Sequence, residues 1–477
     1  MGTFFGIEIG RRGIMVQQRA LETTGHNIAN AGTKGYSRQE VVLATTPPYS
    51  FPGMGAGQQG TGVKAQEVRR IREEFLDFQY RNEVKTLGRW QVRQNILEKL
   101  EAIFNEPSDE GMGAVLGRFF DAWQNVARYP ESEGARSALR QEGITLAEAF
   151  RHMADQISDL KADINSSIGV KVNEINSVAR QVRDLNAQIV KAEAGNMAAN
   201  DLRDRRDLLL DQLSEVVPIQ VEEDRFGAVS IVVRDHTLLS GHKVNALSVD
   251  VASGKVTWPD GAEYRIGRRP YGTLEGLLEA VHVDEANPGL IQSYEERLDT
   301  LAATIIEQVN NLHMKGVGLT GLTGIEFFSG DNAGNMSVSK NILKSDGLNL
   351  IAAAVKPEDY DTNPSCPPLG DGSNALLIAQ LRHETLVNGT TTFNDYYNGL
   401  VAELGVQGQE AERNVDNQTI LTSEIDNRRL AVSGVSLDEE AVNMIRFQQA
   451  YNASARLITV VDEMLEVLIN RTGLVGR

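Results

Sequence analysis

The residues best suited to chemistry in this sequence are a glycine-rich loop and a few scattered histidines and acids. Residues 55–60 read GAGQQG and fit the pattern G-x-G-x-x-G, whose glycines let backbone N–H groups approach the phosphates of a dinucleotide. Such a loop must follow a buried strand and open a helix. Here Pro47, Pro48 and Pro52 precede it, and no acidic residue closes an evident strand after it. The pattern therefore predicts a flexible loop and no cofactor.

Histidines and acids offer no better candidate for catalysis or metal binding. His236 and His242 are the closest pair of histidines, and His383-Glu384 lacks the second histidine of an H-E-x-x-H zinc site. No serine lies in the G-x-S-x-G turn of a hydrolase. Asp371 hints at an ion-binding loop but lacks the alternating acids of a calcium site. We therefore expect structural or surface histidines, no metal and no enzymatic activity.

Composition argues against several classes of partner. The chain has 477 residues, 65 acidic and 47 basic, and a formal charge of −18. This charge argues against nucleic acid and membrane partners, because both select basic surfaces. The single Cys366 allows no internal disulfide. No apolar run approaches the ~20 residues that span a bilayer, and Glu8, Arg11 and Arg12 interrupt any apolar core of a signal peptide. The residues alone predict a cytosolic protein of about two to four domains.

A short basic cluster contrasts with this acidic composition. It consists of Lys64, Arg69, Arg70 and Arg72. A charge run of this length is usually a solvated face. The alternative is that these side chains pair with carboxylates of a neighbouring subunit.

The elements that must position all these residues are clearest at the two ends of the chain. Both ends carry apolar residues one heptad apart. These are Ile7, Ile14, Leu21 and Ile28 near the N-terminus, and Leu437, Met444, Tyr451, Ile458 and Leu465 near the C-terminus. Alternating steps of three and four residues keep such a stripe on one helix face, which is typical of helices that bury a seam. The seam must close on the other terminus or on a neighbouring subunit, which indicates an assembly protein.

The middle of the chain is predicted to be helical from about residue 72 to Pro218, with breaks at Pro107 and Pro130. The strongest helix, over about residues 150–189, has an apolar stripe with steps close to 3.5 residues. We expect this stripe to be core. Ser373-Asn374 and Ser436 are expected to cap helices, and Glu439 completes a capping box with Ser436.

These patterns predict a mainly α fold with a smaller β insertion: a long-helix bundle body, with the N- and C-terminal helices paired as a coiled coil. β-branched residues and turn signals dominate the insertion, with a hairpin around Pro259-Asp260-Gly261. The expected domains are a terminal coiled-coil domain (1–71 and 435–477), a helical body (72–217, 271–315 and 373–434), a small β domain (218–270) and an irregular segment (316–372). The irregular segment either joins the β domain or lies on the helical body.

The residues that follow the first stripe resemble a known family. Residues 27–39 read NIANAGTKGYSRQ and closely resemble the N-terminal signature of bacterial flagellar axial proteins, the rod, hook and hook-associated family. Its signature positions here are Asn27, Asn30, Gly35, Tyr36, Ser37, Arg38 and Gln39. Residues 437–456 resemble the matching C-terminal end. His26 and Lys34 stand where relatives more often have asparagine and proline, so the turn is less rigid at Lys34.

The resemblance implies a structural subunit that polymerises at the hook–filament junction through an axial domain made of its terminal helices. The alternative within the family is another axial subunit, such as hook protein. The implied partners are further copies in a ring or helical layer, hook protein, the next hook-associated protein toward the filament, and an export chaperone. The implied location is the extracellular flagellum, reached by type III export without a cleaved signal peptide, which replaces the cytosolic expectation. An adhesin or binding module that uses the β insertion stays open as a further role.

Overall fold

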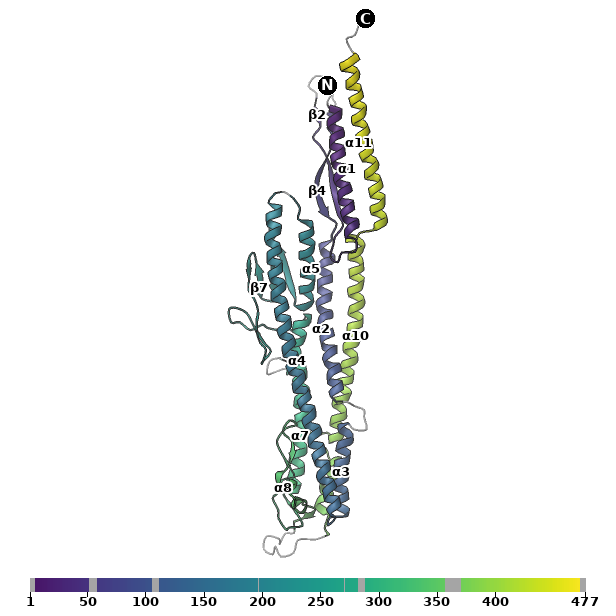
Figure 1. Cartoon of the computed structure of the whole chain (residues 1–477). Coiled ribbons are helices and arrows are strands. Elements are labelled where there is room, and N and C mark those ends of the chain that lie inside the picture. The colour runs from purple at the N-terminus through teal and green to yellow at the C-terminus, as the bar shows by residue number, and fades with distance from the viewer. Residues whose placement is uncertain are drawn as a thin grey trace. The chain divides into compact units, whose positions relative to one another are not determined.

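The computed structural model describes residues 5–50, 58–104, 111–195, 197–269, 271–281, 288–356 and 370–471. The fold is mainly α with small sheets, as predicted (Figure 1). The chain forms two compact units: residues 1–86, 173–247 and 418–477 make the first, and residues 87–172 and 248–417 the second. Three long helices contribute to both units: α2 (Glu74–Phe104), α4 (Glu133–Glu193) and α10 (Phe393–Ser433).

The first unit holds both terminal helices and most of the strands. Its further elements are α1 (Phe5–Asn30), β1 (Gln39–Thr45), β2 (Tyr49–Ser50), β3 (Gln58–Gln59), β4 (Val63–Arg70), α5 (Asn200–Val216), β5 (Ile219–Glu223), β6 (Val229–Val233), β7 (His236–Ser240), β8 (Lys243–Val244) and α11 (Leu437–Arg471). β1 pairs with β4 and β2 with β3, while β5 to β8 form one antiparallel sheet in chain order.

The second unit combines helices with short two-stranded pairings. Its elements are α3 (Met112–Arg128), β9 (Ser248–Asp250), β10 (Lys255–Thr257), α6 (Gly272–Val281), α7 (Leu290–His313), β11 (Gly316–Val317), β12 (Phe328–Ser329), β13 (Ser337–Val338), α8 (Lys340–Leu343), the 3₁₀ turn Gly347–Leu350, β14 (Ala354–Val355), α9 (Ser373–Gln380) and the 3₁₀ turn Leu381–His383. β9 pairs with β10, β11 with β14 and β12 with β13.

Helix α4 confirms the predicted core stripe and exceeds its predicted length. It has 61 residues, or about 90 Å at 1.5 Å per residue. Every apolar position of the stripe from Phe150 to Ile189 is buried. The stripe also continues toward the N-terminus through Leu139 and Leu146, which explains why the helix begins just after Pro130.

Three asparagines interrupt the apolar face of α4 and bind the backbone of β elements. The Asn165 amide donates to the carbonyl of Ala252 (3.3 Å). Asn176 donates to the carbonyl of Leu247 (2.8 Å) and accepts its N–H (2.9 Å). Asn186 makes the same pair of bonds with Val229 (2.8 and 3.1 Å). Steps of 11 and 10 residues keep the three on one side of the helix, because three helical turns take about 11 residues.

The predicted β insertion is divided between the two units. β5 to β8 belong to the first unit and the β9–β10 hairpin to the second. In β6, Val229, Ile231 and Val233 are buried while the residues between them are half-buried, which is the period-two pattern of a sheet packed on one face. The predicted turn at Pro259-Asp260-Gly261 is present, with Gly261 at φ +87°.

The described residues of the irregular segment lie on the helical elements of the second unit. Asn310 of α7 accepts the backbone N–H groups of Phe327 and Phe328 (2.9 Å each) and donates to the carbonyl of Phe328 (2.9 Å). Asn374 of α9 donates to the carbonyl of Ala352 (2.8 Å). These bonds fix the segment to α7 and α9 through its main chain.

Two predicted helix caps have different outcomes. Helix α11 begins after Ser436, whose hydroxyl accepts the N–H of Glu439 (3.4 Å), so the predicted cap is confirmed. The Glu439 side chain, predicted to complete a capping box, accepts from Arg38. The N-cap of α9 is Gly372 rather than Ser373-Asn374. The carboxylate of Asp371 accepts the N–H of Ser373 (2.9 Å) and supplies the missing acceptor at this helix end.

Candidate assembly surface

Helices α1 and α11 run antiparallel and side by side, with glycines of α1 at their contact (Figure 1). A Cβ built on Gly10 would come within 2.6 Å of Cγ1 of Ile458, and one on Gly13 within 2.6 Å of the Ser454 hydroxyl oxygen. Gly6 meets Val461 in the same way, at 2.8 Å. The glycines that weaken α1 in isolation therefore let the two helix backbones approach closely.

The stripe residues predicted from the heptads do not share one environment. Ile7, Ile14, Leu21 and Ile28 are half-buried, as are Tyr451, Ile458 and Leu465, whereas Leu437 and Met444 are exposed. Ile458 lies against Gly10 of its own chain. The seam predicted through Ile458 is therefore at least partly closed within one molecule.

A second apolar stripe lies on α11, and the sequence reading missed it. Its members are exposed and follow steps of three and four residues within each of two groups. They are Val442 and Ile445, then Leu457, Val460, Met464 and Val467. At 100° per residue their mean direction is about 120° from that of Ser454, Ile458 and Val461, and Leu457 is the member nearest that contact. We call this set the outer stripe. Its spacing is visible in the sequence, but the more regular heptad beside it predicts a different face of α11 as the buried seam.

The signature segment 27–39 folds as a turn held by one buried amide. Asn27 accepts the Tyr36 hydroxyl (2.7 Å) and the backbone N–H of Gln39 (2.9 Å), and it donates to the carbonyl of Gln39 (2.9 Å). Gly35 has φ +83°, and a Cβ there would meet Leu208 of α5 at 3.2 Å. The turn thus needs an amide at position 27 and a glycine at position 35. Asn30 holds the end of α1 through the carbonyl of His26 (3.0 Å).

Arg38 joins this turn to the start of α11. Its backbone N–H donates to the carbonyl of Ser433 (2.8 Å), the last residue of α10. Its guanidinium donates to Glu440 (2.8 Å) and Glu439 (2.6 Å) in the first turn of α11. Acidic residues at a helix N-terminus also favour the helix dipole. Arg38 therefore sets where α11 leaves α10.

Ser37 and Gln39 attach the same turn to α5. The backbone N–H of Ser37 donates to Asp204 (2.9 Å), and the Gln39 amide donates to Asp201 (2.8 Å). Asn200 donates to the Gln39 side-chain oxygen (3.1 Å) and to the carbonyl of Val68 (2.8 Å). One short segment therefore contacts α1, β4, α5, α10 and α11.

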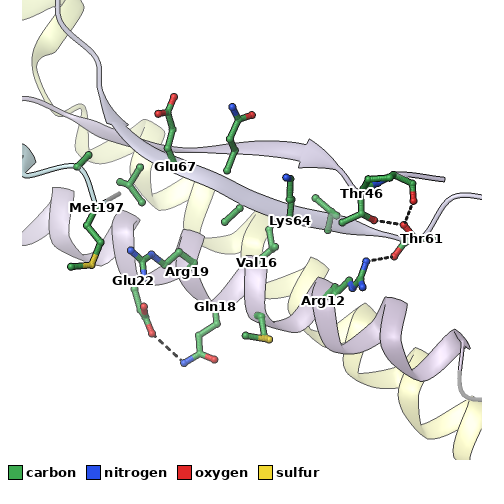
Figure 2. A pocket seen from close by; sticks show the side chains of 17 residues that line it. Arg12, Val16, Gln18, Arg19, Glu22, Thr46, Thr61, Lys64, Glu67 and Met197 are labelled. Atoms are coloured by element: carbon green, nitrogen blue, oxygen red, sulfur yellow. Dashed lines mark hydrogen bonds between the residues drawn. The ribbon is translucent and has the colours of Figure 1, made fainter. Parts of the chain in front are cut away.

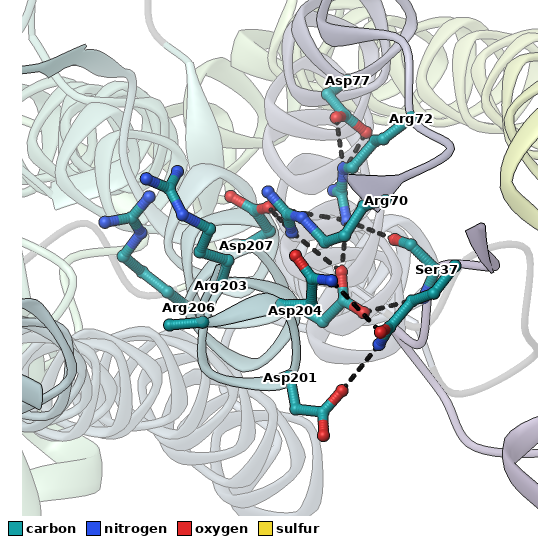
Figure 3. A network of polar contacts seen from close by, with 12 residues as sticks. Ser37, Arg70, Arg72, Asp77, Asp201, Arg203, Asp204, Arg206 and Asp207 are labelled. Carbon is teal, nitrogen blue, oxygen red and sulfur yellow. Dashed lines mark hydrogen bonds and ion pairs between the residues drawn. The ribbon is translucent and has the colours of Figure 1, made fainter. Parts of the chain in front are cut away.

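Below this turn lies a network of mostly buried arginines and aspartates (Figure 3). Arg70 pairs with Asp204 and Asp207 (2.8 Å each), and Arg72 pairs with Asp77 (2.5 Å). Burial alone would raise the pKa of Asp207, but Arg72 and Arg70 hold it below its ordinary value. Asp207 is therefore an ionised acceptor rather than a proton donor.

The network continues onto α10. Asp211 of α5 accepts from Arg81 of α2 and Arg429 of α10 (2.7 Å each). Arg429 also lies over the ring of Tyr80, with Cζ 4.1 Å from the ring centroid. The network thus ties α2, α5 and α10 of the first unit together.

The predicted basic cluster has two outcomes. Arg70 and Arg72 belong to the buried network and pair with carboxylates of their own chain, so a wholly solvated face was wrong for them. Arg69 is exposed and pairs with Glu40, and Lys64 is exposed. The sequence could not show that Arg70 pairs with carboxylates 134 and 137 positions away, whereas Asp77, the partner of Arg72, is only five positions on.

The candidates for chemistry lie apart from one another. His236 is half-buried, and His242 and His383 are exposed. Asp371 is engaged by Ser373. Among the residues that the structure describes, no three histidines, cysteines or acids are grouped to hold a metal ion. Residues 55–57 of the glycine-rich loop and Cys366 lie outside the described residues. Within the described helices, none has the length and apolarity to cross a membrane.

Comparisons with known proteins agree along the whole chain. Residues 97–328 match the family described as flagellar hook-associated protein FlgK helical domain. Residues 7–36 match flagella basal body rod protein, and residues 427–471 match the flagellar basal body rod FlgEFG protein C-terminal family.

Individual relatives and one solved structure point the same way. Flagellar hook-associated protein 1 of Bacillus subtilis is 33% identical over 517 aligned residues, covering 100% of this chain and 99% of the relative. The protein of the same name in Salmonella typhimurium is 24% identical and covers 96% of this chain and 98% of the relative. The flagellar hook junction protein FlgK from Burkholderia pseudomallei has a similar fold, with a TM-score of 0.60 at 16% identity, over 74% of this chain and 100% of that one.

Proposed function

The chain belongs to the flagellar hook-associated protein 1 family, and on that premise we propose that it polymerises through the outer stripe of α11. It is a structural subunit of the bacterial flagellum at the junction of hook and filament. The terminal segments, 1–71 and 435–477, act in this proposal as one assembly domain. The alternative of hook protein is disfavoured, since the relatives named above are hook-associated proteins.

One observation carries the proposal: α11 has two apolar faces, and its own chain covers only one. Ser454, Ile458 and Val461 contact the glycines of α1. The outer stripe is exposed, with Val460 at 45% and Met464 at 60%. A helix that is apolar on two sides needs a second neighbour, because exposed apolar stripes of this length favour association. Another copy of the chain supplies that neighbour in a polymer.

We also propose which subunits neighbour the chain in the flagellum and how the chain is exported. Copies would form a ring or helical layer, with hook protein on one side and the next hook-associated protein on the other. The chain would reach this place by type III export without a cleaved signal peptide, accompanied by a chaperone. Support comes from family membership.

The proposal assigns no catalysis to the chain. Four acids of the network, Asp77, Asp204, Asp207 and Asp211, are each paired with arginines. Asp207, whose pKa these arginines lower, is a poor general acid at neutral pH. Their arrangement supports a mechanical role that holds α2, α5 and α10 together.

The test is Val460→Asp in cells that lack their own copy of the chain. A charge on the outer stripe should prevent recovery of the chain in isolated hooks and should release filaments, because burying an unpaired charge costs several kcal/mol. The melting temperature of the purified variant should stay unchanged, since Val460 is exposed. Val406→Asp, at an exposed valine of α10, is the matched control and should assemble normally.

Ile458→Asp separates the two faces of α11. This side chain contacts Gly10 within the chain, so its replacement should loosen the α1–α11 pair and lower the melting temperature before any assembly. Normal incorporation of Val460→Asp would refute the proposed role of the outer stripe.

A further inference from the structure

A groove of about 1040 Å³ lies between α1, β4 and the connection that precedes α5 (Figure 2). Helix α1 contributes Arg12, Met15 and Arg19 among others, and β4 contributes the six consecutive residues 63–68. Met197 closes one end. Met15 and Met197 are 57% and 67% exposed, so the groove has apolar side chains without cover.

The groove lies on the side of α1 away from α11. Gly6, Gly10 and Gly13 face α11. Arg12, Met15, Arg19 and Glu22 line the groove and follow steps of three and four residues. At 100° per residue, these two sets point roughly opposite ways. The terminal pair therefore has the groove on one side and the outer stripe of α11 on the other.

Charge is unevenly distributed along the groove. Arg12 and Lys64 lie toward one end, where Arg12 donates to the carbonyl of Thr61 (3.1 Å) and pairs with Glu8 (2.8 Å). Glu22 and Glu67 lie toward the other end, with Arg19 beside Glu22 (Figure 2). Lys64 and Glu67 are exposed and form no ion pair with any described residue. β4 also has no strand on its second edge among the described residues. The groove thus offers apolar side chains between a basic end and an end where two carboxylates outnumber one guanidinium.

The outer stripe of α11 carries the matching charges in the opposite order along its chain. Arg456 comes first, and Glu463 follows about two turns nearer the C-terminus. Both side chains are exposed, and within the described part of the chain neither makes an ion pair. Because α11 runs antiparallel to α1, its acidic end points the same way as the basic end of the groove. In a neighbouring copy with the same orientation, the acidic end of α11 therefore faces the basic end of the groove, and its basic end faces the other end.

We infer that the groove of one copy receives the outer stripe of α11 from a second copy. This inference rests on the proposed function, since it names the surface that the outer stripe meets. Lys64 and Glu67 are about 10 Å apart along β4, at 3.3 Å per residue. Arg456 and Glu463 are also about 10 Å apart along α11. The two spacings match, so Lys64 pairs with Glu463 and Glu67 with Arg456 while apolar residues fill the middle.

Such a contact is head-to-tail, because the two surfaces differ and lie on opposite sides of the same helix pair. A head-to-tail contact repeats until a rotation closes it into a ring or leaves it as a helix. Both outcomes suit a layer in a tubular assembly. A contact between identical surfaces would instead stop at two copies.

The experiment uses paired charge swaps that keep the net charge of the chain. The groove swap is Lys64→Glu with Glu67→Lys, and the helix swap is Arg456→Glu with Glu463→Lys. Each swap alone should lower recovery of the chain in isolated hooks by about tenfold or more, because like charges then meet across the contact. The chain with all four changes should assemble within about twofold of the unchanged chain, since opposite charges meet again. Melting of each purified variant should match the unchanged chain, because all four positions are exposed.

The outcomes separate this inference from the proposed function. Normal assembly of either swap, or continued failure of the fourfold variant, would overturn the pairing of groove and stripe. If Val460→Asp still blocks assembly in that case, the outer stripe meets another surface and the proposed function stands. If Val460→Asp also assembles normally, both the inference and the proposed function fail.

Discussion

Arg38 and Glu440 lie 402 positions apart in the chain and are joined by a 2.8 Å hydrogen bond between Nε and Oε1. Glu440 is only 2% exposed, so this carboxylate depends on Arg38 for its partner. The bond closes the chain on itself at the point where α1, β1 and α11 meet. It also ties the turn after α1 to the start of α11, so the two ends of the sequence are joined in one structural unit.

We predict that Arg38→Gln weakens the start of α11. Removing the guanidinium leaves Glu440 buried without its ion partner, which should lower the free energy of unfolding by about 2–4 kcal/mol. Amide hydrogen exchange should rise in residues 437–445. Arg69→Gln is the control, because its pair with Glu40 is exposed and should contribute less than about 1 kcal/mol. Equal effects of the two changes would contradict the role of Arg38.

Asn27→Ala should loosen the signature turn. The change removes the two bonds that the side chain accepts and the one that it donates. The expected loss is about 2–4 kcal/mol in chemical unfolding, because the backbone of Gln39 is left buried without partners. Asn30→Ala, whose side chain bonds near the exposed end of α1, should cost about 1 kcal/mol or less. A smaller effect at Asn27 than at Asn30 would show that another group holds the turn.

Two glycines of α1 should respond oppositely to alanine. A Cβ at Gly10 would collide with Ile458 and push α1 from α11, so Gly10→Ala should destabilise the pair by about 1–3 kcal/mol. Nothing lies within 4 Å of a Cβ at Gly25, so Gly25→Ala should stabilise the helix by up to about 1 kcal/mol. Thermal unfolding measures both. A stabilising Gly10→Ala would mean that the helices are not in close contact.

Acid should weaken the first unit through the arginine–aspartate network. The pKa of folded Asp207 lies below its ordinary value of 3.8, so the stability it contributes is complete above that value. This contribution is lost as the pH falls from about 4 through the lowered pKa. Asp207→Asn should cost about 1–3 kcal/mol at pH 7 and should flatten the decline in urea unfolding measured below pH 4. An unchanged acid decline in Asp207→Asn would assign it to other carboxylates.

The sequence was sufficient to predict helices, buried stripes and caps where the pattern involves only residues close together in the chain. The buried stripe of α4 follows from the spacing of Phe150 to Ile189, and the cap at Ser436 from the glutamate three residues later. Both patterns depend on neighbours within a few turns of one helix. The end of α3 at Arg128, next to the break predicted at Pro130, is local in the same sense.

The parts that could not be predicted depend on residues far apart in the chain. Asp204, Asp207 and Asp211 recur on one face of α5, and this spacing was a visible signal. Nothing local indicates that Arg70, Arg72 and Arg81 are their partners. The same limit explains why the predicted seam at Ile458 met α1 of its own chain while the exposed Val460 was overlooked.

The asparagines of α4 affect which positions of this chain can be substituted during evolution. Asn176 and Asn186 grip the main chain of Leu247 and Val229, and every amino acid except proline presents the same N–H and C=O groups there. The attachment is therefore indifferent to which side chains the β elements carry outward. Substitutions on the solvent side of β5 to β8 can accumulate without shifting the sheet along the helix. The exposed face of a sheet that is bound through its main chain can vary in sequence, while the sequence of the helix that binds it stays constrained.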